Sequence, residues 1–127
     1  MTARILVVDD EPVVANTLAM IFRASGYIAE AVYCGEDALL SIDVNPPSLV
    51  ITDIMMPGLN GVELAKLIQT AYPDCPILLF SGNTNAQGLL DAARQNGRSF
   101  EVLAKPVYPP DLLTKVATLL SQNIAQA

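Results

Sequence analysis

The stretch that decides the fold is Ile5-Leu6-Val7-Val8-Asp9-Asp10-Glu11-Pro12, close to the start of the chain. Its four apolar residues form a short run of the kind that makes a buried strand. The proline stands where a helix starts, a position at which its missing N–H costs nothing. Two aspartates and a glutamate lie between these elements. The stretch therefore predicts a strand that ends in carboxylates and turns directly into a helix.

Short apolar runs and amphipathic stretches alternate along the rest of the chain. Further apolar runs are 49–52, closed by Asp53, 77–80, closed by Ser81, and 100–104, closed by Lys105; a weaker run covers 27–32. Helices are expected from 11 to the stop at 25–26, over 35–45, from the turn at 57–60 to Pro73, over 84–96 and from 109–111 onward. Five strands alternating with five helices predict an α/β fold whose parallel sheet is covered on both faces.

Composition limits the classes of function. The chain has 127 residues, the size of one domain, and is 52% hydrophobic, so it can bury a full core. Seven basic residues stand against thirteen acidic ones, which gives a net charge of −6. With no Lys/Arg run, this balance argues against direct binding to nucleic acid or to an anionic membrane surface.

The chain shows no signal of export or of membrane insertion. Residues 1–4 run straight into a strand pattern without the segments of a signal peptide. No apolar stretch approaches the ~20 residues that span a bilayer. We therefore expect a cytoplasmic protein, in which Cys34 and Cys75 stay reduced and act as small apolar fillers. The absence of histidine argues against a zinc site.

The polar strand ends form the candidate site. In a doubly wound five-stranded sheet of order 2-1-3-4-5, strand order reverses between strands 1 and 3, and ligands bind there, beyond the carboxyl ends of the strands. Asp9, Asp10 and Asp53 should therefore be neighbours. Clustered carboxylates repel one another unless a cation compensates them. Oxygen ligands alone favour Mg²⁺. Lys105 on the same edge adds a positive charge for an incoming phosphoryl group.

These residues together carry a family resemblance. The chain resembles the receiver domain of two-component response regulators, through Asp9-Asp10-Glu11-Pro12, Asp53 to Gly58, Gly61, Ser81-Gly82 and Lys105-Pro106. The resemblance covers essentially the whole chain, and the combination of motifs is highly specific although each motif alone is weak. It implies the flavodoxin-like (βα)5 fold and a single receiver domain over 1–127, with no output domain in this chain.

The resemblance assigns the chemistry of phosphorylation. It implies that Asp53 attacks the phosphohistidine of a sensor histidine kinase or phosphotransfer protein and becomes an aspartyl phosphate. Asp10 and Asp53 would bind Mg²⁺ together with the backbone carbonyl of Met55, and Asp9 would act through a coordinated water. The domain would not be a turnover enzyme: it would catalyse its own phosphotransfer and lose the phosphoryl group slowly.

The resemblance also implies a switch. Lys105 would pair with the phosphoryl oxygens, and Ser81 would turn inward to hydrogen-bond one of them. The added charge would bias the loops after strands four and five, and so the face that binds a downstream protein or a second copy of the chain. One departure is Val102, because the family usually has an aromatic residue there; Phe100 lies two residues earlier on the same strand face.

Three other functions are compatible with parts of the pattern. A degenerate receiver would act as a scaffold without phosphorylation, and Val102 keeps this reading open. An aspartate-based phosphatase would carry an acid two residues after the nucleophile, where this chain has Met55. A flavodoxin-like FMN module would need a Ser/Thr/Gly-rich loop after strand one, where this chain has acids. The phosphorylatable receiver accounts for the most residues.

Overall fold

The predicted alternation of strands and helices is present in the computed structural model, which describes residues 2–82, 91, 100–104 and 108–126. In chain order the elements are β1 (Arg4–Val8), α1 (Pro12–Ala24), β2 (Ile28–Val32), α2 (Gly35–Val44), β3 (Leu49–Asp53), α3 (Gly61–Ala71), β4 (Ile77–Ser81), β5 (Glu101–Ala104) and α5 (Pro109–Gln126). Apart from residue 91, the helix expected over 84–96 lies outside the described residues, as does Lys105-Pro106.

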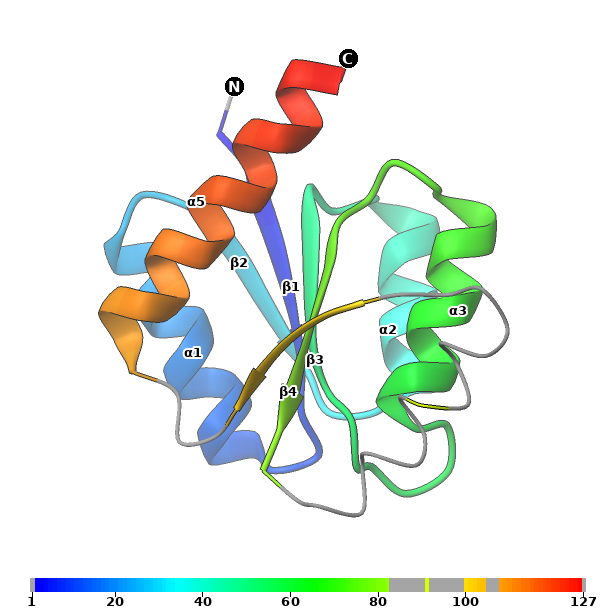
Figure 1. The fold of residues 1–127 in the computed structure, drawn as a ribbon. Helices are drawn as coiled ribbons and strands as arrows, with labels where there is room; N and C mark the ends of the chain where they lie inside the picture. The colour runs from blue at the N-terminus through cyan, green and yellow to red at the C-terminus, as the bar shows by residue number, and fades with distance from the viewer. Residues whose placement is uncertain (1, 83–90, 92–99, 105–107, 127) are drawn as a thin grey trace.

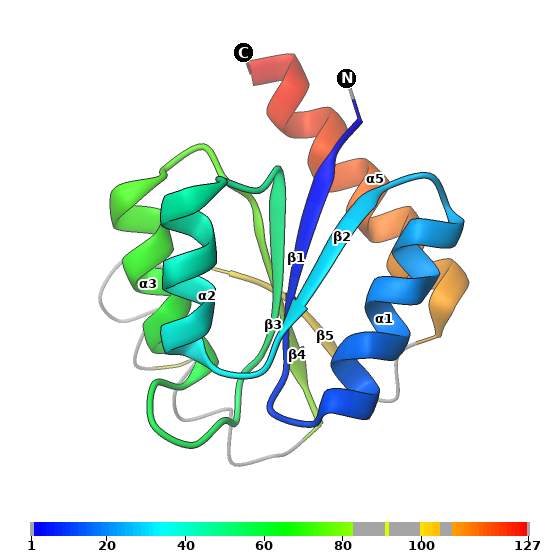
Figure 2. The same cartoon turned by 180° about the vertical axis from the view of Figure 1, so that it is seen from behind.

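The five strands form one parallel sheet in the order β2-β1-β3-β4-β5, which confirms the predicted fold class (Figure 1). α1 and α5 cover one face of the sheet, and α2 and α3 cover the other, as the views from both sides show (Figure 2). All strands point the same way, so the carboxyl ends of β1 and β3 lie at the same end of the sheet.

The core is divided by the sheet into two layers. Ile5 and Val7 pack with α1 and α5, whereas Leu6 and Val8 pack with α2 and α3. Because both faces of β1 are covered, every residue of the run is apolar instead of every second one. This explains why β1, β3 and β4 stand out as continuous apolar runs in the sequence.

Several element boundaries differ from expectation by one or two residues. β2 begins at Ile28 because the N–H of Tyr27 is bonded to the carbonyl of Phe22 and so closes the end of α1 (3.0 Å). β5 begins at Glu101, and Phe100 instead packs against the layer under α2 and α3. α2 ends at Val44, and Asn45 caps it.

None of the helices in the part of the chain that the structure describes is long and apolar enough to cross a bilayer.

Candidate functional site

Asp9, Asp10 and Asp53 form one carboxylate cluster at the carboxyl ends of the strands. Val8 and Thr52 are register partners on the neighbouring strands β1 and β3, so the aspartates that follow them leave the sheet at the same level. One oxygen from each of the three carboxylates lies within 4.8 Å of the others. The structure thus brings together the acids that the strand order predicted to be neighbours.

The three acids differ in exposure. Asp9 is 0% and Asp53 7% exposed, whereas Asp10 is open to solvent. Asp9 accepts a hydrogen bond from the backbone N–H of Glu11 (2.9 Å), which holds its carboxylate against the start of α1. Two buried carboxylates with a third beside them favour a bound cation, because removing like charges from water is costly without compensation. An all-oxygen donor set of this size fits Mg²⁺.

The segment that follows Asp53 stays tied to the sheet and then to α3. The N–H of Ile54 donates to the carbonyl of Phe80 (3.1 Å), and the carbonyl of Ile54 accepts from the N–H of Gly61 (2.8 Å). Met55 follows Ile54 and is 41% exposed, whereas Met56 is buried in the core.

Ser81 ends β4, the strand beside β3. Asp53 is the register partner of Phe80, so Ser81 lies one position beyond it. On its other side Ser81 is paired with Ala104, the residue before Lys105. Lys105 lies outside the described residues, and its predicted contact with the phosphoryl group therefore stays a prediction.

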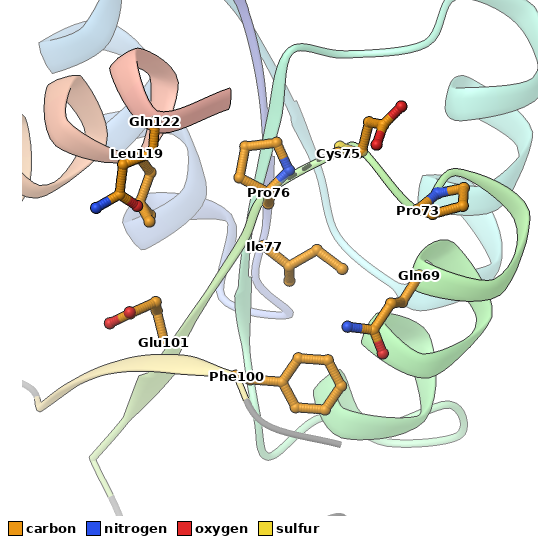
Figure 3. Close-up of a pocket in the computed structure, with 10 residues that line it drawn as sticks. Gln69, Pro73, Cys75, Pro76, Ile77, Phe100, Glu101, Leu119 and Gln122 are labelled. Atoms are coloured by element: carbon orange, nitrogen blue, oxygen red, sulfur yellow. Dashed lines mark hydrogen bonds between the residues drawn. The ribbon is translucent and has the colours of Figure 1, made fainter. Parts of the chain in front are cut away.

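Two hollows lie at opposite ends of the sheet. One of about 660 Å³ opens beside the acids, between α1 and α5, and its lining includes Glu11, Phe80 and Gly82. The other, of about 240 Å³, lies at the start of β4, with Phe100 and Gln69 on one side and Leu119 and Gln122 on the other (Figure 3). The first hollow adjoins the candidate site, and the second does not.

Residues 5–117 match the family model of the response regulator receiver domain. The chain belongs to that family. Receiver domains are signalling domains whose general role is to be phosphorylated by histidine kinases, and they bind Mg²⁺ at an acidic pocket. Here the corresponding pocket is the cluster of Asp9, Asp10 and Asp53. The predicted family and fold are thus confirmed.

Relatives and solved structures agree with this membership. The DNA-binding response regulator MtrA of Mycolicibacterium smegmatis is 29% identical over 123 residues, which are 97% of this chain and 53% of that protein. The chain spans about half the length of the curated relatives it matches. A putative response regulator from Chloroflexus aurantiacus is 31% identical, with a TM-score of 0.81 over 95% of this chain and 99% of that one. NtrX from Brucella abortus is 28% identical, with a TM-score of 0.87 over 99% of this chain and 28% of that one.

The receiver domain has one contact near the site that local sequence patterns do not reveal. Leu59, in the segment between Asp53 and α3, packs on Gly35 at the start of α2. Gly58, in the turn expected at 57–60, has a φ of +70°. Gly61 lies against the backbone of Asp53.

Proposed function

We propose that Asp53 of this receiver domain accepts a phosphoryl group from the phosphohistidine of a sensor kinase or phosphotransfer protein. The observation that carries the proposal is the carboxylate cluster, in which Asp53 lies at the end of a central strand with Asp9 and Asp10 beside it. An oxygen of Asp53 attacks phosphorus, a P–O bond forms and the P–N bond to histidine breaks. The released imidazole keeps the electron pair of the broken bond and takes up a proton.

The residues around Asp53 would bind the metal ion and neutralise the phosphoryl oxygens during this transfer. Asp10 and Asp53 would hold Mg²⁺, with the backbone carbonyl of Met55 as a further ligand, and Asp9 would act through a coordinated water. When bound, this ion supplies positive charge against the phosphoryl oxygens. Lys105, which follows the end of β5 in the sequence, would neutralise them from the other side. The transfer is the chain's own chemistry, and slow hydrolysis of the aspartyl phosphate resets it.

Phosphorylation would change the face that the domain presents to partners. The phosphoryl group adds about −1.5 to −2 charge beside the end of β4. Ser81 ends β4 beside β5, and its hydroxyl would respond to this charge. We propose that this edge then binds a downstream protein or a second copy of the chain, in the cytoplasm, where kinases draw on ATP. Residues 1–127 would act here as one receiver domain.

Intact-mass analysis tests the phosphoacceptor. Acetyl phosphate with Mg²⁺ should add the mass of one phosphoryl group to the wild type and none to Asp53→Ala, and beryllofluoride should bind only the wild type. Asp74→Ala is the matched control, because Asp74 is an exposed acid at the hollow at the opposite end of the sheet. A wild type that gains no mass and binds no beryllofluoride would contradict the proposal and favour the phosphorylation-independent scaffold.

A further inference from the structure

The segment that connects Asp53 to α3 rests on the first residue of α2. Gly35 is buried there, and a Cβ built on it would lie 2.8 Å from Cδ2 of Leu59, 3.0 Å from its Cβ and 3.1 Å from its Cγ. Carbon atoms that are not bonded pack at about 3.5–4.0 Å. The backbone of Gly35 does not have a positive φ, so the need for glycine comes from Leu59 and not from the backbone.

The other end of the same segment is held by Gly61. A Cβ on Gly61 would fall on the carbonyl oxygen of Asp53 and within 2.8 Å of Cα of Ile54. These are backbone atoms of the site itself, so no side-chain rotation can relieve the clash. α3 starts immediately, since Asn60 and Glu63 form a capping box. The segment 54–60 is therefore fixed between the sheet edge and two helices.

We propose that Gly35 is a positioning residue for the phosphorylation site. By leaving room for Leu59, it sets the path of the segment 54–60 and so the place of the Met55 backbone beside the carboxylates. This inference rests on the proposed function, in which that backbone carbonyl binds Mg²⁺. In this role Gly35 acts through Leu59, whose atoms are the three nearest to a Cβ built on it. Mg²⁺ demands near-ideal geometry, so a shift of one ligand by a few tenths of an ångström weakens binding.

Gly26 supplies a control for general loss of stability. It lies between α1 and β2, at the end of the sheet away from the acids. Its φ is +96°, and nothing lies within 4 Å of a Cβ built on it. Gly26→Ala therefore strains the backbone without crowding any neighbour. It should destabilise the fold and leave the site as it is.

The experiment compares Mg²⁺ dissociation constants from titration calorimetry with melting temperatures and acetyl phosphate labelling. Gly35→Ala should weaken Mg²⁺ binding about tenfold, the scale of losing a contact that orients a ligand, and slow labelling. Gly26→Ala should lower the melting temperature with Mg²⁺ affinity unchanged. Gly35→Ala combined with Leu59→Ala should bind Mg²⁺ better than Gly35→Ala alone, because the shorter side chain removes Cγ and Cδ2 from the crowded contact.

Several outcomes would overturn the inference. One is a Gly35→Ala protein that binds Mg²⁺ like the wild type; another is an equal loss of affinity in Gly26→Ala. If Gly35→Ala does not fold, Leu59→Phe replaces it, because the larger side chain crowds the same contact from the other side; unchanged affinity in that variant also refutes the positioning role. A wild type that labels normally beside an unaffected Gly35→Ala disproves only this inference. A wild type without Mg²⁺ binding and labelling disproves the proposed function as well.

Discussion

Asp9 and Asp53 leave neighbouring strands at the same level, with carboxylate oxygens within 4.8 Å of each other and both side chains buried. The residues before them, Val8 and Thr52, are register partners. This pairing exists because β3 lies beside β1 and not beside β2. The two acids therefore share one environment, in which each raises the cost of charge on the other and both favour a cation.

Asp10 should contribute to Mg²⁺ affinity without contributing to the stability of the metal-free fold. Its side chain is exposed, so Asp10→Asn removes a proposed ligand and one of three like charges without opening a cavity. We expect Mg²⁺ affinity to fall by at least about tenfold, while the melting temperature in EDTA stays level or rises as repulsion is relieved. Titration calorimetry and thermal denaturation measure the two effects. Asp74→Asn, at the opposite end of the sheet, should change neither quantity. A clear drop in the metal-free melting temperature of Asp10→Asn would show that Asp10 also stabilises the metal-free fold, contrary to this prediction.

Ser81 should affect the response to phosphorylation more than phosphorylation itself. It ends β4 one position beyond the partner of Asp53 and is paired with Ala104 of β5. In Ser81→Ala, acetyl phosphate should still label Asp53, but the amide shifts that beryllofluoride causes in β5 should shrink. NMR spectra of wild type and variant test this. Thr70→Ala, which removes an exposed hydroxyl from α3, is the control. Equal amide shifts in Ser81→Ala and wild type would show that the Ser81 hydroxyl does not contribute to the response.

The start of α3 should depend on a reciprocal pair of hydrogen bonds. The side chain of Asn60 accepts from the N–H of Glu63 (2.9 Å), and the carboxylate of Glu63 accepts from the N–H of Asn60 (3.0 Å). Asn60→Ala should lower the free energy of unfolding by about 1 kcal/mol, the usual cost of an N-cap. Urea denaturation at unchanged m-value measures it. Asn60→Ser, which keeps a capping oxygen, should recover most of the loss; equal losses in both variants would argue against the cap as the cause.

Cys75 should be unreactive in the folded protein at moderate pH. Burial raises the pKa of its thiol to about 11. The unfolded chain ionises this thiol near its usual pKa of about 8.5, so the thiol opposes folding only as the pH rises above that value. Iodoacetamide should therefore label Cys75 slowly at about pH 8 and faster once urea unfolds the chain. Mass analysis in a Cys34→Ser background follows the single site. Rapid labelling of the native protein would show that the thiol is accessible as thiolate.

The alternation of elements was predictable because its causes are local. β1, β3 and β4 are buried on both faces and so appear as unbroken apolar runs, and α1 begins at Pro12 as its fixed φ favours. The error of one residue at the start of β2 also has a local cause. Tyr27 is apolar and aromatic like a strand residue, but its N–H belongs to the hydrogen bonds that end α1.

The residue types of the site and their places at strand ends follow from the chain alone, since a carboxylate after an apolar run is visible without any fold. Their grouping required the order of the sheet, and their difference in burial required the packed molecule: Asp9 is enclosed and Asp10 open although they are adjacent. The contact between Gly35 and Leu59 likewise required the packed molecule. It joins segments distant in sequence, so it arises from the packing of α2 against the β3–α3 connection and leaves no periodic trace in either segment.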